Sequence, residues 1–410
     1  MKQQQTLGHF IKISPTIYQT ISNIKEAGIE KGLEELKTFE KGKSYYTVQQ
    51  DNTIALIRIP QEINELTKIS LVATHGDSPT FKLKPQHQIN DTNFVRLGVE
   101  PYGGLLLSSW LDRPLGIAGI VYYQKDNNKL ERKIVDLAET TVVIPNVAMH
   151  IRKEDNHNYK QDVDFVPILA SKDLKVLDLI REKYKLPEIL SFDLMLYNQE
   201  DAINWGNKKE YISSARLDDM QNVYAGAKAF LESEVSHNIQ IFVCFDKEEI
   251  GSRGIEGADS QFLTNIIKQI KRDLKITDFN KLLNKSLAIS ADNAHAFHPA
   301  HAELYDNENR TFMNKGIVIK THAGLAYQTN AYSSATIKML AKNNKIPYQE
   351  FSNKPGVSGG GTLGVYLTGH INMPTIDIGL AQLAMHSTYE TAGNLDTEYM
   401  YQLLKAFYKD

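Results

Sequence analysis

The feature that most constrains the fold of this chain is the alternation of short apolar, β-branched runs with amphipathic segments. Six runs read as strands: residues 53–59, 69–74, 239–245, 286–290, 316–320 and 375–379. Four segments with apolar residues every three and four positions read as helices, at about 217–234, 260–275, 331–343 and 394–408. This alternation is typical of α/β domains. We therefore expect an α/β fold with a central mixed, largely parallel sheet flanked by helices.

A long stretch between the second and third of these strands has a different character. It carries the pair Gly103-Gly104, strand-like runs at 104–109, 117–123 and 141–151, and polar turns such as KDNNK at 125–129. These features indicate a mostly β domain inserted into the α/β domain. We therefore divide the chain into a discontinuous α/β domain, residues 1–86 and 207–410, and an inserted β-rich domain, residues 87–206.

Charge and composition exclude several classes of protein. The 410 residues include 46 Lys and Arg against 49 Asp and Glu, interspersed along the chain, whereas a nucleic-acid binder needs a clustered positive surface. The N-terminus, MKQQQTLGHF, has no apolar signal-peptide core, and no window approaches the roughly 18 apolar residues of a membrane span. We therefore expect a cytoplasmic protein that binds neither nucleic acid nor membrane. With one cysteine, Cys244, any metal must be bound by His, Asp and Glu.

Residues able to bind a metal directly follow several of the predicted strands. They are His75 and Asp77 after ISLVAT, Asp246, Glu248 and Glu249 after IQIFVCF, Asp292, His295 and His298 after SLAIS, and His386 in TIDIGLAQLAMHS. Ligand sites in open α/β sheets lie beyond the carboxyl ends of the strands, so these four endings can meet in one crevice. Each ending alone is more typical of an ordinary loop, but their joint occurrence favours a shared metal site.

Oxygen and imidazole ligands without cysteine suit zinc, manganese or cobalt. Two ions about 3.5–4 Å apart need a bridging carboxylate. Asp218, in YISSARLDDM just before a predicted helix, is the natural candidate, with Asp219 as its competitor. A further carboxylate must take a proton from the metal-activated water. Either Glu248 or Glu249 can do this, and the residue pattern alone does not choose between them.

Ordered blocks along nearly the whole chain resemble the aspartyl aminopeptidase family of dinuclear zinc exopeptidases, which includes yeast vacuolar aminopeptidase I. The blocks are ATHGDSP, SWLDRPL, SARLDDM, FDKEEIGS, SADNAHAFHP, KGIVIK and LAMHS. The resemblance implies a metallo-aminopeptidase that releases the N-terminal residue of peptides. It also implies that the inserted domain mediates dimerisation, and that the dimers of this homo-oligomer assemble into a tetrahedral dodecamer around an internal chamber.

The resemblance also implies two divalent metal ions per subunit, with zinc as the first candidate and manganese or cobalt as alternatives. Carried over position by position, it implies that His75, Asp218 and Asp292 hold one metal. Asp218, Glu249 and His386 would hold the other, so that Asp218 bridges the two ions.

The remaining roles also follow from the resemblance. Glu248 becomes the general base that activates water, and Asp77 the acid that orients the His75 imidazole. The positions that match the family's substrate-site residues are His150, His295, Lys320 and Tyr327. Lys320 would give an acidic first residue, Asp or Glu, a charged partner, and His150 would reach across the dimer interface into the neighbouring site.

One segment departs from the family pattern. Where the family usually has an Asn-Asp pair ahead of Cys-Gly-Ser-Thr-Ile-Gly, this chain reads SNKPGVSGGGTLG, with Asn353 and Lys354. The missing acid makes preference for neutral first residues such as Leu an alternative to acidic ones.

Two other functions compete with the aminopeptidase. A dinuclear N-deacylase or carboxypeptidase would need a cation for a terminal carboxylate, such as Arg216 or Arg253. A nucleotide-binding protein would use SGGGTLG as a phosphate-binding turn, but no Walker lysine follows the glycines.

Overall fold

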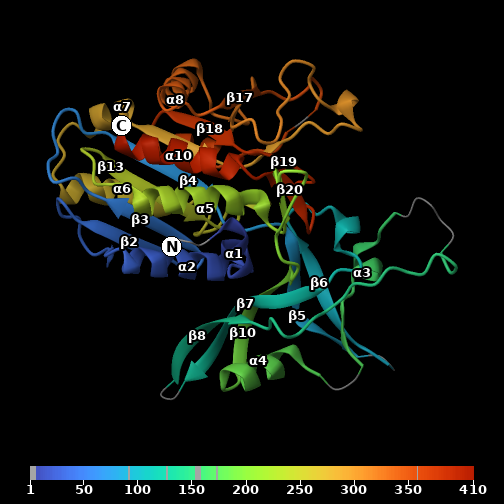
Figure 1. Cartoon of the computed structure of the whole chain (residues 1–410). Helices are drawn as coiled ribbons and strands as arrows, with labels where there is room; N and C mark the ends of the chain where they lie inside the picture. Colours follow the sequence, from blue (N-terminus) through green and yellow to red (C-terminus); the bar gives the residue numbers. More distant parts are fainter. Residues whose placement is uncertain (1–5, 91–92, 126–127, 153–157, 172–173, 358) are drawn as a thin grey trace.

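The largest element of the computed structural model is a nine-stranded mixed sheet (Figure 1). The structure describes residues 6–90, 93–125, 128–152, 158–171, 174–357 and 359–410. The strands of the sheet are, in spatial order, β1 (Glu34–Glu35), β2 (Ser44–Gln49), β3 (Thr53–Arg58), β13 (Ile239–Phe245), β4 (Ile69–His75), β14 (Leu287–Ala291), β18 (Thr375–Gly379), β16 (Ile317–Lys320) and β17 (Tyr348–Phe351).

The four central strands, β13, β4, β14 and β18, run parallel and are buried along their whole length. On either side, β3 and β16 run antiparallel to their central neighbours. Strands that are covered on both faces have continuous apolar sequences, so they can be recognised from the sequence. All six predicted strands are present in the structure. The predicted central, mixed, largely parallel sheet is confirmed.

Helices cover both faces of this sheet, each face with its own hydrophobic core. On one face lie α1 (Leu7–Lys12), α2 (Ile17–Glu30), α5 (Leu217–Glu232), α8 (Ala331–Asn343) and α10 (Asp396–Lys409). On the other lie α6 (Phe262–Asp273), α7 (Phe279–Lys285) and α9 (Gly364–Ile371). The four helices expected from periodicity are α5, α6, α8 and α10. Within the described ranges, no helix has the length and apolar character needed to cross a membrane.

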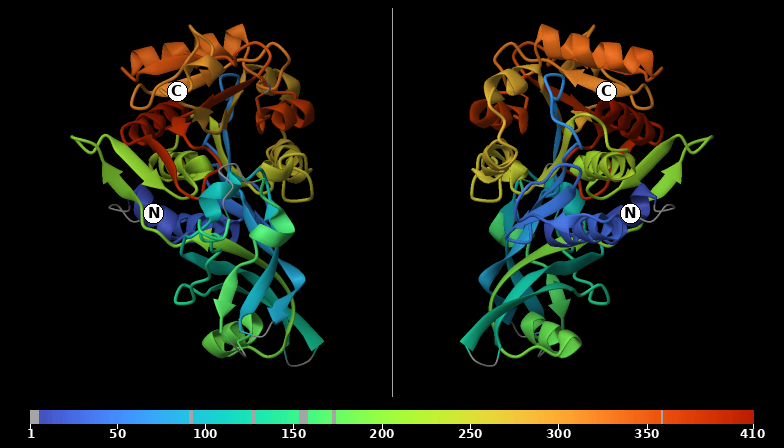
Figure 2. Two further views of the ribbon diagram at one scale, coloured as in Figure 1. Left: turned by 90° about the vertical axis from the view of Figure 1, so that its right-hand side faces the viewer. Right: turned by 90° about the vertical axis from the view of Figure 1, so that its left-hand side faces the viewer.

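A second sheet, of six antiparallel strands, projects from this α/β body with a core of its own (Figures 1 and 2). Its strands are, in spatial order, β8 (Lys129–Asp136), β7 (Leu115–Lys125), β10 (Ile189–Asn198), β5 (Thr80–Asn90), β6 (Val95–Tyr102) and β9 (Ile168–Ala170), with α3 (Gln161–Asp164) and α4 (Val176–Tyr184) beside them. β5 begins at Thr80, before the expected boundary at residue 87. The boundary was predicted too late because the sequence of β5, TFKLKPQHQIN, mixes polar and apolar residues and has no apolar run. The two-domain division and the dimerisation role stay predictions.

Two of the three strands predicted in the inserted region, at residues 104–109 and 141–151, do not form. Residues 104–109 form a loop that leads into a short 3-10 helix, Leu107–Trp110. Residues 141–151 contain only isolated bridges at Val142 and Val143, and Pro145 lacks the N–H that a ladder needs. Of the KDNNK turn, residues 126–127 lie outside the described residues.

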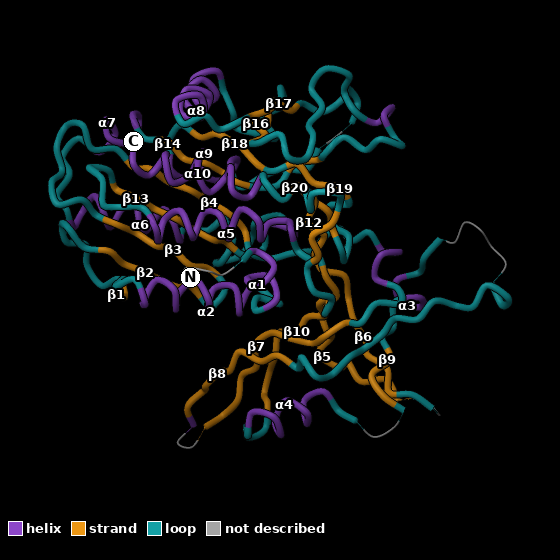
Figure 3. Tube along the Cα trace, viewed as in Figure 1, coloured by secondary structure: helices purple, strands orange, loops and turns teal. Residues whose placement is uncertain are grey.

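A third, five-stranded sheet joins the body to the inserted region (Figure 3). Its strands are β11 (Ile203–Trp205), β12 (Tyr211–Ser214), β20 (Glu390–Gly393), β19 (Ala381–Leu383) and β15 (Ala294–His295). The chain leaves the main sheet after His75, builds the projecting sheet, and returns through β12 just before Asp218. The insertion therefore starts and ends beside the candidate metal ligands.

Helix α5, which carries Asp218, approaches the sheet closely at Gly226. A Cβ at this position would lie 2.7 Å from the ring of Phe242 in β13. We expect Gly226→Leu to lower the free energy of unfolding by about 1–3 kcal/mol through overpacking. Gly369→Ala is the control, because Gly369 lies in α9 with open space around it and should gain about 0.5–1 kcal/mol. Thermal unfolding midpoints of the two variants check this, and equal midpoints would contradict it.

Candidate metal centre

Acidic and imidazole side chains gather beyond the carboxyl ends of the central strands. His75 is the last residue of β4, and Asp292 follows β14 directly. Glu248 and Glu249 lie in a short 3-10 helix, Glu248–Ile250, just after β13. Asp218 lies in the first turn of α5, and His386 in the loop between β19 and β20. The structure thus brings together residues from five separate parts of the chain.

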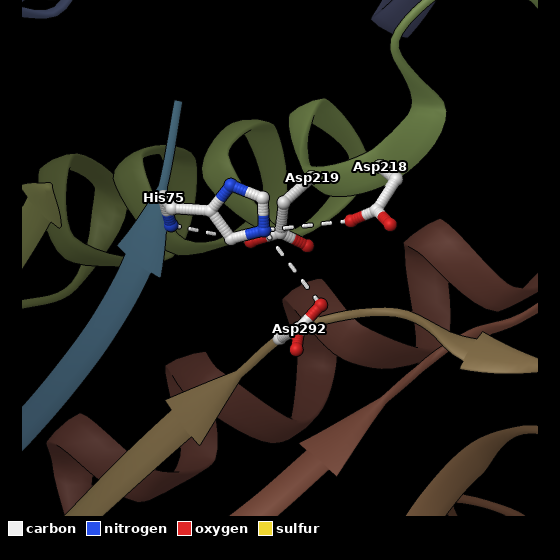
Figure 4. A group of neighbouring side chains, drawn as sticks. All are labelled: His75, Asp218, Asp219 and Asp292. Carbon is white, nitrogen blue, oxygen red and sulfur yellow. Dashed lines mark hydrogen bonds and ion pairs between the residues drawn. The ribbon is translucent and has the colours of Figure 1, made fainter. Parts of the chain in front are cut away.

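The first group of ligand atoms surrounds the His75 imidazole. Its Nε2 atom lies 3.5 Å from Asp218 Oδ1 and 3.7 Å from Asp292 Oδ1 (Figure 4). One ligand atom from each of His75, Asp218, Asp219 and Asp292 falls within 4.8 Å of the others. All four residues are buried.

The second group surrounds the His386 imidazole. Its Nε2 atom lies 3.3 Å from Glu249 Oε2 and 3.9 Å from Asp218 Oδ2. Asp218 therefore turns one carboxylate oxygen toward His75 and the other toward His386. This is the arrangement that a bridging carboxylate needs.

Asp219 is engaged differently. Its Oδ1 atom accepts a hydrogen bond of 2.5 Å from the Asn222 side chain, and its Oδ2 atom accepts one of 3.4 Å from the His75 backbone N–H. Asp219 thus supports His75, and of the two adjacent acids only Asp218 contacts both groups.

The residues fit divalent metal ions. Asp218 Oδ1 and Glu249 Oε1 are buried and have no hydrogen-bond partner among the residues that the structure describes, so each leaves a lone pair free for a cation. Burial, with the carboxylates of Asp292 and Asp77, raises the pKa of Glu248 to about 8. Burial and the Asp218 carboxylate raise the pKa of Glu249 well above its usual range. Such crowding of acids is relieved by bound cations, and a set of O and N ligands suits zinc.

Asp77 connects the imidazole to the loop that carries the two glutamates. Its backbone oxygen lies 3.1 Å from His75 Nδ1, which orients the ring. Its buried carboxylate accepts hydrogen bonds from the Tyr102 hydroxyl at 2.9 Å and from the backbone N–H groups of Glu248 and Glu249, each at 3.2 Å. One residue therefore contacts both His75 and this loop, His75 through its backbone oxygen and the loop through its carboxylate.

A cleft of about 550 Å³ opens beside the two groups. The predicted substrate residues His295, Lys320 and Tyr327 line it together with Glu248. Tyr327 is buried, with its ring 5.2 Å from Lys320 Nζ. His295 is exposed to the cleft, where desolvation and the Lys320 charge lower its pKa.

Lys320 is buried, and its three N–H donors already have acceptors. Nζ lies 2.8 Å from the Asp292 backbone oxygen, 3.2 Å from Asp292 Oδ2 and 3.1 Å from the Asn293 backbone oxygen. Although burial opposes it, the Lys320 charge together with the His75 imidazole lowers the pKa of Asp292 below its usual range. Lys320 adds positive charge to the cleft, as expected, and it also pairs with Asp292, a contact that the residue pattern did not indicate.

His150 is not brought to the cleft of its own chain. It lies exposed in the loop after Pro145 in the inserted region and is absent from the described residues that line the cleft. Arg216 and Arg253, the cations considered for a deacylase or carboxypeptidase, are also absent from that lining.

Sequence reasoning missed Glu390. Its buried carboxylate accepts hydrogen bonds from the Asp218 N–H at 3.0 Å and the His386 N–H at 2.8 Å. Burial and the Asp218 carboxylate raise the pKa of Glu390 to about 8. Glu390 thus supports both sides of the second group, and no sequence signal marks it.

Gly103 and Gly104 also contribute. A Cβ at Gly103 would lie 3.2 Å from Glu249 Cβ, and one at Gly104 would lie 3.4 Å from the His386 ring. The pair, noted in the sequence as a feature of the inserted domain, lets the chain pass close over the second group. This path explains why residues 104–109 do not form a strand.

Comparison with known proteins identifies the family. A family model described as aminopeptidase I zinc metalloprotease (M18) matches residues 10–408. A probable M18 family aminopeptidase 2 from Clostridium novyi (strain NT) is 36% identical over 419 residues, which cover 97% of this chain and 96% of that protein. The chain belongs to the M18 family of zinc aminopeptidases. Membership leaves the deacylase and nucleotide-binding alternatives without support.

Solved structures agree with the M18 fold. The structure titled as the Ape4 and Nbr1 complex has a TM-score of 0.92 and 29% identity, covering 98% of this chain and 84% of that one. The structure of the S. cerevisiae mApe1 dodecamer has a TM-score of 0.85 and 24% identity, covering 98% and 95%.

The different contacts of the two adjacent acids give a metal-binding prediction. We expect Asp218→Asn to weaken zinc binding more than Asp219→Asn, because Asp218 contacts both groups and Asp219 contacts Asn222 and the backbone. Supporting residues typically change metal affinity by roughly 10–100-fold, which is the range expected for Asp219→Asn. Zinc titration of metal-stripped protein, with metal content by mass spectrometry, measures both. A larger loss in Asp219→Asn would contradict the assignment.

Proposed function

We propose that this M18 aminopeptidase holds two zinc ions bridged by Asp218 and removes acidic N-terminal residues from peptides, with Glu248 as general base. His75, Asp218 and Asp292 would hold one ion, and Asp218, Glu249 and His386 the other. The observation that best supports this is the orientation of Asp218, whose two oxygens face His75 and His386 at 3.5 and 3.9 Å. Manganese or cobalt could occupy the same ligands.

When bound, zinc lowers the pKa of water and polarises a carbonyl. The chain's own residues supply the rest. Glu248 lines the cleft and would accept the water proton and return it to the departing amine. The Asp77 carboxylate holds the Glu248 backbone by accepting a hydrogen bond of 3.2 Å from its N–H. The Glu390 carboxylate holds the His386 backbone by accepting a hydrogen bond of 2.8 Å from its N–H, and the missing side chains of Gly103 and Gly104 leave room for Glu249 and His386.

The first side chain of the peptide would enter the part of the cleft lined by His295, Lys320 and Tyr327. The Lys320 ammonium already donates hydrogen bonds to Asp292 and Asn293. It would therefore attract an acidic side chain of the substrate by longer-range electrostatic attraction, without a direct hydrogen bond, in a partly desolvated part of the cleft. Tyr327, which lines the same part of the cleft, would contribute its ring to this space. Preference for neutral residues such as Leu is the alternative, because this mode of recognition is weaker than a direct ion pair.

Quaternary structure is part of the proposal. The similar S. cerevisiae protein mApe1 forms a dodecamer. We infer that this chain forms dimers, and that these dimers assemble into a tetrahedral dodecamer with the peptide-binding sites facing an internal chamber. His150 lies between Met149 and Ile151, which are 76% and 81% exposed, and exposed apolar residues of this kind are typical of interaction sites. His150 would reach the cleft of a neighbouring subunit. A cytoplasmic location stays a prediction from the sequence.

The role of Glu248 is tested by separating proton transfer from metal binding. We expect Glu248→Gln to keep its zinc and lose at least about 100-fold in kcat, because a general base contributes roughly 10²–10⁴-fold. Glu249→Gln should lose zinc as well. The assay is release of the first residue from matched Asp-, Glu-, Leu- and Lys-peptides by protein reconstituted with zinc, manganese or cobalt.

In the same assay, wild type should release Asp and Glu faster than Leu. Faster release of Leu would favour the neutral preference. Full activity of the Glu248→Gln variant would show that Glu248 is not the general base.

The role of His150 is tested by complementation. We expect His150→Ala to lower activity while zinc binding stays normal. Co-expression of His150→Ala with Glu248→Gln should then give more activity than either variant alone, because a mixed pair contains one site with both side chains intact. If His150 serves its own chain or none, the mixture will show only the average of the two variants.

A further inference from the structure

The loop that carries Glu248 and Glu249 is closed at its base. It runs from Asp246, directly after β13, to Glu256, and the Asp246 N–H lies 3.4 Å from the Glu256 backbone oxygen. Inside the loop, Asp246 Oδ1 accepts a hydrogen bond of 2.8 Å from the Lys247 N–H. Lys247 has a φ of 67°, and its ammonium pairs with the Glu256 carboxylate at 2.7 Å. The direction of the two glutamates therefore depends on how Asp246 and Glu256 are held.

Two consecutive residues of the β2–β3 hairpin hold these two ends. The Asn52 side chain donates a hydrogen bond of 2.6 Å to Asp246 Oδ2, and the Thr53 hydroxyl donates one of 2.6 Å to the Glu256 backbone oxygen. Asn52, Thr53 and Asp246 are all buried. Neither bond is part of the β-ladder, so pairing of β2 with β3 does not require them.

The residue before this pair contacts the inserted region. Asp51 accepts two hydrogen bonds from the Arg132 guanidinium of β8, one of them 3.0 Å long from Nη2 to Oδ1. The two-bond geometry fixes orientation as well as distance. Three consecutive residues, 51–53, thus contact the projecting sheet, the start of the loop and its end.

We propose that residues 51–53 position the loop from Asp246 to Glu256, which we call the catalytic loop. The Arg132–Asp51 ion pair would connect the inserted sheet to residues 51–53 and so help to hold this loop. The proposal rests on the roles proposed above for Glu248 and Glu249. Asn52 and Thr53 are positioning residues that act through Asp246 and Glu256. A shift of about 1 Å in a reacting group can cost roughly 100-fold in rate, so loss of one anchor should lower turnover while the cleft still binds peptide.

Thr53 gives the sharpest test, because valine has the shape of threonine without its hydroxyl. We expect Thr53→Val to lower kcat roughly 10- to 100-fold, with KM within about twofold of wild type and zinc retained. Thr53→Ser keeps a hydroxyl and should restore most of the loss. Thr375→Val is the matched control, since its buried hydroxyl donates to the Met373 backbone oxygen at 2.9 Å, at the opposite end of β18 from the cleft.

The contribution of the inserted sheet is tested with Arg132→Ala. An exposed ion pair is weak, so we expect at most about a fivefold loss in kcat. Tyr18→Phe is its control, because it removes a different hydrogen bond between the α/β body and the insertion, from the Tyr18 hydroxyl to Asp193 at 3.0 Å. Arg132→Ala should lower kcat and Tyr18→Phe should not.

Wild-type kcat in Thr53→Val, or equal losses in Thr53→Val and Thr375→Val, would overturn the positioning role. Equal effects of Arg132→Ala and Tyr18→Phe would overturn the part assigned to the inserted sheet. Glu248→Gln, assayed alongside, separates the two levels. If it is inactive while Thr53→Val is normal, only this inference fails. If it is fully active, the proposed base is wrong and the positioning role falls with it.

Discussion

The structure depends on the concentration of buried carboxylates at the carboxyl end of the central strands. The acids buried there are Asp77, Asp218, Asp219, Asp246, Asp292 and Glu390. A buried carboxylate is costly unless it is paired, hydrogen-bonded or bound to a metal. Glu390 accepts two backbone N–H groups and Asp77 accepts two more, while Lys320 pairs with Asp292. What these contacts leave unpaired, at Asp218 and Glu249, is a place for cations.

The same arrangement explains why the chain is interrupted where it is. The insertion starts after His75 and ends before Asp218, so the projecting sheet is anchored at the metal centre itself. Gly103 and Gly104 pass close over Glu249 and His386. Arg132 of the inserted sheet forms an ion pair with Asp51 in the β2–β3 hairpin, which contacts the catalytic loop. The inserted region therefore lies directly against groups at the site.

The fold was largely predictable because its central strands are buried on both faces. Runs such as IQIFVCF are apolar apart from Gln240, so the strand, its burial and the polar residues at its end are all visible in the sequence. The inserted region was predicted less well. Its β5 mixes polar and apolar residues, and the segment 104–109 is shaped by contacts with the loop at His386, which lies far away in the sequence.

The sequence by itself determined which residue types reach the metal centre, because each strand ending is a local pattern. The residue pattern alone left Asp219 as a competitor of Asp218, and the resemblance favoured Asp218. The tertiary structure adds the physical difference between them, which is that Asp218 faces His75 and His386 whereas Asp219 contacts Asn222. It also decided that Lys320 is engaged with Asp292, that Glu390 supports both groups, and that Asn52 and Thr53 hold the catalytic loop. These contacts join residues tens to hundreds of positions apart, and no local pattern encodes such a pairing.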